Sequence, residues 1–145
     1  MCKTCQNPER CIVNAKKWAN DQETSIDKGE ELLKELRERQ LTGSFVRWTG
    51  HATKRSLERS ISEPNVRLLI NQDADVFEYY ANSYGKEKLS LMGNLKLGIG
   101  KYRPIHVILK RNGMEEWKVV TMYDPSTEEF RWSNNYQTKI CFCPK

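Results

Sequence analysis

The first half of the chain carries apolar residues at helical spacing. From Ser25 onward, charged residues fill most positions, and the apolar residues fall on one side of a helix. They are Ile26, Leu32, Leu33 and Leu36. Ser25 is suited to cap the start of such a helix, and the Thr42-Gly43 pair is suited to end it. The spacing therefore predicts an amphipathic helix between Ser25 and Thr42.

Two shorter helices are predicted next. Thr49 can cap a helix over residues 50–59, and we expect Leu57 and Ile61 to anchor it to the core. Ser62-Glu63-Pro64 is typical of the start of another helix, because proline is tolerated in a first turn. Its apolar face, at i, i+3 and i+4, consists of Val66, Leu69 and Ile70.

After Asp75 the pattern takes the shorter period of β-strands. The predicted strands cover residues 76–80, 89–97, 105–109 and 117–123, with short extended pieces at 45–48, 130–132 and 140–142. Asn112-Gly113 is a strong hairpin signal before the last strand, on which Val119, Thr121 and Tyr123 share a face by alternation. Helices followed by strands predict an α+β fold, with N-terminal helices packed on one face of a curved antiparallel β-sheet.

Residues 1–24 differ in composition from the rest of the chain. They are polar, contain three cysteines and have few large apolar side chains. We expect them to form a Cys-bearing N-terminal appendage, and residues 25–145 to form a single α+β domain. The chain has 145 residues, which is enough for a core that needs no disulfides.

Hydropathy limits the expected location of the protein. No segment approaches the roughly 20 consecutive apolar residues of a membrane span. The N-terminus, MCKTCQNPERCIVNAKK, lacks the apolar region of a secretory signal. We therefore expect a cytoplasmic protein without a membrane partner.

The chain is basic, with a net charge of +5 and a pI of about 9.0. Most of the excess of lysine and arginine lies in residues 47–67 and 101–118, whereas residues 21–38 carry seven acidic and three basic side chains. A polyanion such as RNA, or an acidic protein, is the partner that this distribution favours.

Three residues spaced by four form the main candidate site. His51, Arg55 and Arg59 share one stripe of the predicted helix, with Lys54 beside them. An imidazole with two guanidiniums suits phosphodiester chemistry, because histidine transfers protons near neutral pH and arginine binds phosphate in a bidentate manner. The alternative is structural: His51 caps the helix locally, and the arginines pair with Glu58, Glu63 or acidic groups on the sheet.

The run HATKRSLERSISEPNVRLLI, residues 51–70, resembles the opening of a family of small bacterial domains of unknown function. In these domains a His-x3-Arg-x3-Arg helix is followed by Ile-Ser and a second helix, and a Val-Val-Thr-x-Tyr strand comes last. Here that strand is residues 119–123, so the resemblance covers about residues 45–125. Ser60 stands where the family often has glycine, which affects the turn rather than the chemistry.

That family is similar in pattern to the barnase–EndoU–colicin–RelE (BECR) group of ribonucleases and toxins. The resemblance implies a metal-independent endoribonuclease in which the 2′-OH attacks the adjacent phosphate and leaves a 2′,3′-cyclic phosphate. His51 would be the acid or base, Arg55 and Arg59 would hold phosphate, and Thr121 and Tyr123 would complete the site. No cofactor is expected for catalysis, and an immunity or antitoxin protein is an expected partner.

His106, the second histidine, lies in the strand over residues 105–109. Alternation places it on one face of the strand with Ile108 and Lys110. If this face borders the helical stripe, His106 or Lys110 could contact substrate or supply a second proton-transfer group. The alternative is a histidine that faces solvent or has its hydrogen bonds satisfied inside the protein.

The five cysteines lie close to the two ends of the chain. An odd number of cysteines in a reducing compartment argues against a disulfide framework. Cys2-x-x-Cys5 is a competent half-site, whereas alternate residues such as Cys141 and Cys143 lie about 7 Å apart on a strand. We therefore expect Cys2, Cys5, Cys11 and Cys141 to be the ligands of a structural zinc. Five reduced cysteines without metal are the alternative, and an iron–sulfur cluster is a lesser one.

Two functional hypotheses remain at this point. The first is the metal-independent endoribonuclease, toxin-like, with His51 at its centre. The second is a non-catalytic module of the same fold that binds RNA or a protein. The sequence does not separate them, because binding of phosphate and its cleavage need the same arginines.

Overall fold

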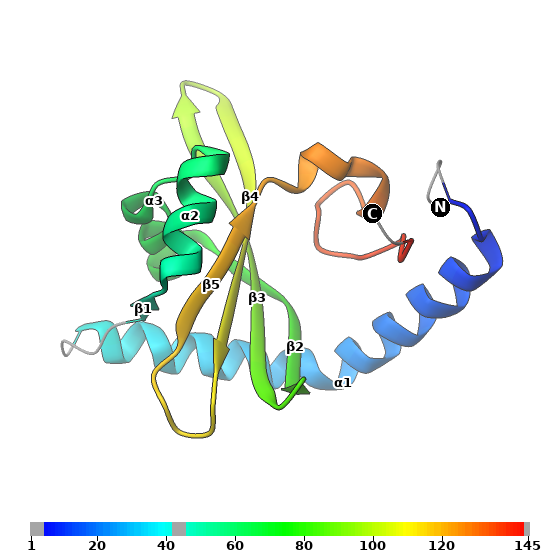
Figure 1. Cartoon of the computed structure of the whole chain (residues 1–145), viewed down its shortest axis with the longest axis horizontal. Helices are drawn as coiled ribbons and strands as arrows, with labels where there is room; N and C mark the ends of the chain where they lie inside the picture. Colours follow the sequence, from blue (N-terminus) through cyan, green and yellow to red (C-terminus); the bar gives the residue numbers. More distant parts are fainter. Residues whose placement is uncertain (1–4, 42–45, 144–145) are drawn as a thin grey trace.

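The computed structural model describes residues 5–41 and 46–143 (Figure 1). Its elements, in chain order, are α1 (Pro8–Leu41), β1 (Arg47–Trp48), α2 (Gly50–Arg59), α3 (Glu63–Leu68), the π-helical turn η1 (Leu69–Asp73), β2 (Asp75–Ser83), β3 (Lys86–Gly98), β4 (Lys101–Arg111), β5 (Lys118–Tyr123) and the 3-10 helix η2 (Pro125–Arg131). The order of helices before strands, and the α+β class, are as the sequence predicts. The pieces at 130–132 and 140–142 are not strands; an isolated bridge joins Trp132 to Lys139, just before the second piece.

α1 is one continuous helix of 34 residues, so the predicted start at Ser25 is wrong. It begins at Pro8, where proline suits the first turn and the Asn7 side chain accepts a hydrogen bond from the Arg10 amide at 3.1 Å. The expected boundary between residues 24 and 25 therefore lies inside a helix. The predicted end at Thr42-Gly43 lies outside the described residues. None of the described helices is long and apolar enough to cross a membrane.

The five strands form one mixed sheet in the order β1-β5-β4-β3-β2. β2 to β5 are antiparallel neighbours, as expected, but β1 runs parallel to β5, with Arg47 opposite Lys118 and Trp48 opposite Val119. The prediction of a purely antiparallel sheet is thus wrong at this edge. The Arg47 amide donates to the Trp117 carbonyl oxygen at 2.8 Å, and this pairing brings the start of α2 next to β5.

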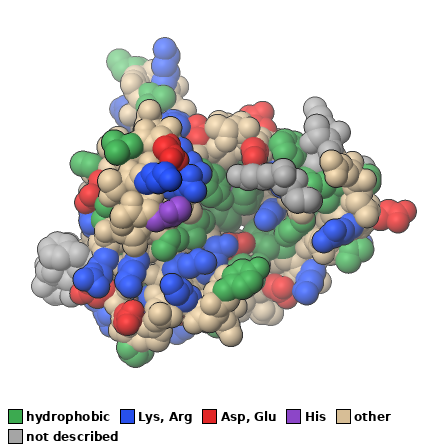
Figure 2. All heavy atoms as spheres, in the orientation of Figure 1, with side chains coloured by type: hydrophobic (Ala, Val, Ile, Leu, Met, Phe, Trp, Pro, Cys, Tyr) green, Lys and Arg blue, Asp and Glu red, His purple; other side chains and the backbone are tan. Residues whose placement is uncertain are grey.

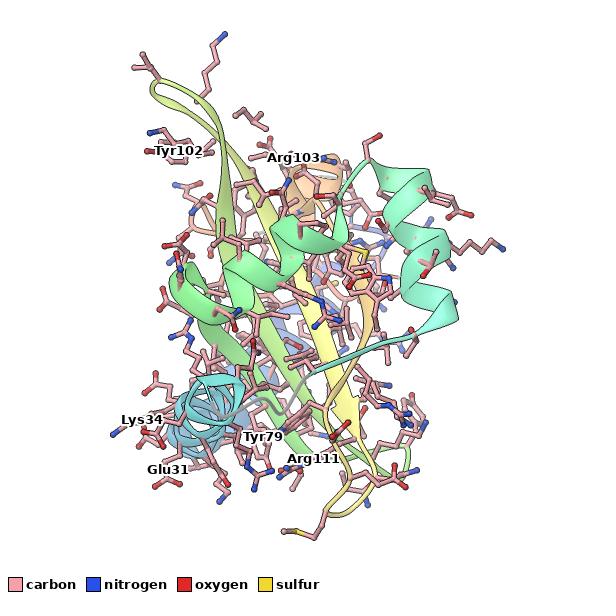
Figure 3. The ribbon with its side chains drawn as sticks, turned by 90° about the vertical axis from the view of Figure 1, so that its left-hand side faces the viewer. Glu31, Lys34, Tyr79, Tyr102, Arg103 and Arg111 are labelled. Carbon is pink, nitrogen blue, oxygen red and sulfur yellow. The ribbon has the colours of Figure 1, made fainter. Side chains whose placement is uncertain are left out.

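The main core lies between one face of the sheet and the helices. The C-terminal half of α1, together with α2, α3 and η1, covers this face, to which β3 and β4 contribute alternate residues. The fully buried side chains include Ile61, Val66, Leu69, Ile70, Leu89, Leu91, Ile105, Val107, Leu109, Val119 and Met122. Figure 3 views α1 nearly end-on: Tyr79 lies on its sheet-facing side, and Glu31 and Lys34 point away.

The other face of the sheet is partly covered as well, which the sequence did not predict. Trp18, from the N-terminal half of α1, packs there with Phe77 and Met92, and the C-terminal segment adds Trp132 and Tyr136. The start of α1 and the C-terminal segment therefore lie on the same side of the molecule (Figure 1).

Gly29 allows α1 to approach β2 closely. A Cβ atom at this position would lie 2.8 Å from Val76 Cγ1 and 3.0 Å from Tyr79 Cβ, closer than such atoms approach. Glycine costs helix stability relative to alanine. Its presence in the middle of α1 is therefore explained by the contact with the strand.

We expect Gly29→Val to lower the free energy of unfolding by about 1–3 kcal/mol, because the added methyl groups overpack this contact. The matched control is Lys28→Val, which places the same side chain on the exposed side of α1 and should change stability by less than about 0.5 kcal/mol. Urea unfolding followed by circular dichroism measures both. Equal midpoints for the two variants would contradict the packing argument.

Candidate functional site

α2 is fixed to β5 through its N-cap residue, Thr49. The Thr49 hydroxyl accepts a hydrogen bond from the Ala52 amide at 3.0 Å and donates to the Val119 carbonyl oxygen at 2.9 Å. Thr49 is thus the predicted cap and also a link to the sheet. Ile61 is buried as expected, but Leu57 is 78% exposed, so its predicted anchoring role is wrong.

The first two residues of the predicted stripe lie at the surface. Arg55 Nε donates to His51 Nε2 at 3.3 Å, and Arg55 Nη1 pairs with the Glu58 carboxylate at 3.0 Å. Nε2 of His51 is therefore the acceptor in this pair. Lys54 is exposed beside them. Figure 2 shows Lys and Arg side chains gathered over α2 and β5, with a histidine among them.

Arg59 turns from the stripe toward the sheet. Its Nη1 donates to the Met122 carbonyl oxygen at 2.7 Å and to the Thr121 hydroxyl at 3.2 Å. The structure thus brings together Arg59 and Thr121, two of the predicted site residues. Both of these acceptors are neutral, and no described carboxylate lies within ion-pair distance of the half-buried guanidinium.

A bulge in β5 determines the face of the sheet on which the Thr121 side chain lies. Ile108 pairs with Thr121 but the next residue, Leu109, pairs with Val119, so Val120 is the extra residue. The expectation that Val119, Thr121 and Tyr123 share a face is therefore wrong for Val119, which is buried in the main core. Thr121 and Tyr123 lie opposite Ile108 and His106, on the other face of the sheet.

A groove of about 520 Å³ lies beside Arg59. One wall comes from the end of α2, β4 and β5, and the other from the C-terminal segment. The lining residues are Glu58, Arg59, Arg103, Tyr123, Asp124, Pro125, Thr127, Glu128, Arg131, Trp132 and Lys139. Four cations and three carboxylates thus face one cavity.

Two of the groove's cations have carboxylate partners. Arg103 pairs with Asp124 at 2.9 Å and donates to the carbonyl oxygens of Arg59 and Ser60, which places it beside the turn after α2 (Figure 3). Arg131 pairs with Glu128 at 2.6 Å. Although burial opposes it, hydrogen bonding from Ser126 and Arg103 lowers the pKa of Asp124 below its ordinary value, so this carboxylate is ionised at neutral pH.

Lys139 is the other cation without a described carboxylate in ion-pair range. It is half-buried, and its ammonium lies 4.6 Å from the centre of the Phe142 ring. Burial lowers the pKa of Lys139 from its ordinary value. Lys139 and Arg59 thus form no ion pair with a described carboxylate, and the lining as a whole carries one more cation than carboxylate.

His106 is a buried structural residue, which corrects the expectation that it contacts substrate. It is 0% exposed; Nδ1 lies 3.1 Å from the Tyr123 hydroxyl and Nε2 2.7 Å from the Tyr136 carbonyl oxygen. The carbonyl oxygen can only accept, so Nε2 carries the proton and Nδ1 accepts from Tyr123. Burial lowers the pKa of His106 to about 4, so the ring is neutral at pH 7. The phenol of Tyr123, which lines the groove, is thus engaged with a neutral imidazole.

Lys110 lies elsewhere. It pairs in register with Lys88 of β3 and Lys118 of β5, toward the end of the sheet opposite Arg103. It does not line the groove. Because Lys110 lies away from Arg59 and the groove, its position does not support the predicted contact with substrate.

The cysteine cluster is the second candidate site. The thiols of Cys5, Cys11, Cys141 and Cys143 all lie within 4.8 Å of one another, a grouping that could hold a metal ion. The Sγ–Sγ distances from Cys5 are 3.1 Å to Cys11 and 3.3 Å to Cys143. Cys143 thus joins the set, in which it was not expected. Cys2, which was expected, lies outside the described residues.

The thiols differ in acidity, because hydrogen bonding with Cys11 raises the pKa of Cys5 to about 12. Hydrogen bonding from Cys5 lowers the pKa of Cys143 to about 6. A thiolate is therefore present in the cluster at neutral pH. Thiolate is the form of cysteine that binds zinc.

Comparison with protein-family models, with curated proteins and with solved structures finds no match for this chain. The likeness to the BECR group therefore stays a prediction. The functional assignment rests on the residues of the two sites.

Sequence reasoning missed Arg103, Arg131 and Lys139 as groove residues. Arg59 and Lys139 are 80 positions apart, so only the fold brings them together. The one local signal was the basic composition of residues 101–118, which includes Arg103.

His106 predicts a specific dependence of stability on pH. Its folded pKa of about 4 lies below the unfolded value near 6.5, so the unfolded chain binds the proton first as the pH falls. The stability due to neutral His106, roughly 3 kcal/mol, is present above pH 6.5 and lost on acidification to about pH 4. His106→Gln should remove this part of the pH dependence, whereas the exposed His51→Gln should keep it. Urea unfolding at a series of pH values tests this, and equal slopes for the wild type and His106→Gln would contradict it.

Proposed function

We propose that the protein binds RNA, with phosphate groups held in the groove by Arg59 and Lys139. The observation that carries the proposal is that these two half-buried cations line one cavity and lack carboxylate partners among the described residues. Partly buried charge without a counter-charge is costly, and a bound anion would offset that cost. A phosphodiester supplies the negative charge and the acceptor oxygens that arginine and lysine bind best.

The surface around the groove supports a polymer rather than a small anion. Beyond Arg59, the exposed Lys54 and the half-buried Arg55 continue the basic surface along α2, with the exposed His51 beside them (Figure 2). Trp132 lines the groove and offers an aromatic ring against which a base could stack. A strand of RNA could thus place one phosphate in the groove and its neighbours along α2.

Lys139→Gln tests this directly. We expect RNA affinity to fall by about tenfold, and the slope of log K against log salt to decrease by about one, because one phosphate contact is lost. Lys34→Gln, on the exposed side of α1 away from the sheet, is the matched control and should bind as the wild type does. Fluorescence anisotropy with a short labelled single-stranded RNA is the measurement. Unchanged binding by Lys139→Gln, with its fold intact by circular dichroism, would sink the proposal.

Cleavage of the bound RNA is a second candidate function, favoured by His51. The single lone pair of His51 Nε2 accepts from Arg55 Nε at 3.3 Å. If Arg55 turned to bind a phosphate, Nε2 could take a proton from the adjacent 2′-OH. Thr121 and Tyr123 are engaged with Arg59 and His106, which leaves His51 as the acid–base group. This corresponds to the metal-independent, toxin-like endoribonuclease of the BECR group. A non-catalytic module would use the same surface for RNA, or for an acidic immunity or antitoxin protein.

Histidine replacement separates cleavage from binding. If the protein is an endoribonuclease, incubation with transfer RNA without added divalent cations should yield 2′,3′-cyclic ends. His51→Gln should abolish the product, while anisotropy shows RNA affinity within about threefold of the wild type. Binding without any cyclic product in the wild type would identify a non-catalytic module.

We further propose that the cysteine cluster holds a structural zinc. Four thiols within 4.8 Å of one another suit the tetrahedral coordination of zinc by four cysteines, and the cluster joins segments more than 120 residues apart. Zinc in this setting would contribute folding energy rather than catalysis.

Metal analysis distinguishes this ligand set from the one expected from the sequence. Protein purified without chelator should contain about one zinc per chain. Cys143→Ser should lose most of it, because a ligand is removed, and Cys2→Ser should retain it. Mass spectrometry for metals measures the content. Zinc retained by Cys143→Ser and lost from Cys2→Ser would instead support the original set of Cys2, Cys5, Cys11 and Cys141.

A further inference from the structure

The C-terminal wall of the groove is tied to the cysteine cluster. The Arg131 carbonyl oxygen accepts from the Ile140 amide at 2.8 Å and from the Cys141 amide at 3.3 Å. Arg131 Nη1 donates to the Cys143 carbonyl oxygen. The two cations of this wall, Arg131 and Lys139, are therefore placed by the same short stretch of chain that carries two of the thiols.

The other two thiols belong to the start of α1 and the residues just before it, and α1 is firmly held by the sheet. The Trp18 indole donates to the buried Glu78 carboxylate at 2.9 Å, and Gln22 accepts from the Tyr79 amide at 2.7 Å. Glu78 also binds the ammonium of Lys88 at 2.9 Å. Cys11 lies on the same helix shortly before these contacts and thus sits on a fixed support.

We propose that metal binding to Cys5, Cys11, Cys141 and Cys143 completes the anion-binding groove, by clamping residues 139–143 against α1. This inference rests on the proposed function and names its regulation: the groove binds RNA well only when the cluster holds a metal. The metal does not touch the RNA. It positions Lys139, and through Cys143 it positions Arg131.

The remaining contacts of the C-terminal segment explain why the effect is local. Trp132 and Tyr136 pack against Phe77 and Met92, and His106 binds the Tyr136 carbonyl oxygen. These contacts do not involve the cluster, so they persist without metal. Beyond Lys139, Phe142 packs against both this group and the cysteine cluster, so the apolar packing of residues 140–143 rests mainly on one aromatic side chain and the thiols. Without metal, the thiols and the thiolate are joined by hydrogen bonds from S–H groups, which are weak donors.

The test compares zinc-loaded, stripped and reloaded full-length protein, with a short fluorescein-labelled single-stranded RNA as the probe. Stripping should weaken RNA binding by about tenfold, and reloading with zinc should restore it. Hydrogen exchange of the same samples should become faster in residues 139–143 and stay unchanged in β3 and β4. Loss of protection throughout the sheet on stripping would overturn the local clamp.

Lys139→Gln tests whether zinc and Lys139 act together on RNA binding, which a zinc with a purely structural role would not show. In this variant, stripping should weaken RNA binding by no more than about twofold, because the cation that the metal positions is already absent. Lys34→Gln, the matched control, should show the full tenfold effect. Equal losses in both variants would overturn the inference while leaving the proposed function standing. A zinc-loaded wild type that binds no RNA would overturn both.

Discussion

The close packing of α1 on β2 at Gly29 is the contact on which both candidate sites depend. α1 is long, and its first half reaches beyond the core. Cys11 lies 18 residues before Gly29, roughly 27 Å along the axis, so a tilt of about 10° at the contact would move its thiol by about 5 Å. Such a shift is comparable to the 4.8 Å within which all four thiols now lie, so it would separate Cys11 from the other three. The lack of a side chain at Gly29 and the buried hydrogen bond from Trp18 to Glu78 therefore fix the position of Cys11. That position determines where the thiols of the C-terminal segment can join it.

The parts of the fold that the sequence predicted are those with local signals. Thr49 and Ser62 cap their helices through their own side chains, and the apolar positions that follow have helical spacing. The first half of α1 was missed because its buried face is not made of ordinary apolar residues. Gln22, for example, is only 5% exposed, yet its burial depends on a hydrogen bond to the Tyr79 amide, which no periodicity contains. Asn7-Pro8 was a usable signal for the true helix start, because it combines a capping residue with a proline in the first turn.

The candidate sites divide in the same way. Arg59 and Thr121 were assigned to one site by a resemblance to known domains and not by spacing. Lys139 and Cys143 owe their positions to tertiary structure, since each meets partners more than 70 residues away. The objection to Cys143 assumed a strand, in which alternate residues lie about 7 Å apart. The segment is not a strand, so Cys141 and Cys143 can direct their thiols to one point.

The different surroundings of the α2 cations indicate different contributions to binding an anion. Arg55 is paired with Glu58 at the surface, where water screens charge, so its net attraction for a phosphate is weak and sensitive to salt. Arg59 is held in one orientation by two neutral oxygens and keeps its charge uncompensated by any described carboxylate. A preorganised, partly desolvated guanidinium loses little entropy on binding and acts in a lower dielectric. Affinity should therefore concentrate in the groove, and the exposed stripe, with His51, should govern how the rest of the strand is oriented. Lys139, on the opposite wall of that groove, adjoins residues 140–143, whose apolar packing rests mainly on Phe142 and the thiols. The strength of binding should therefore depend on how firmly the two ends of the chain are joined.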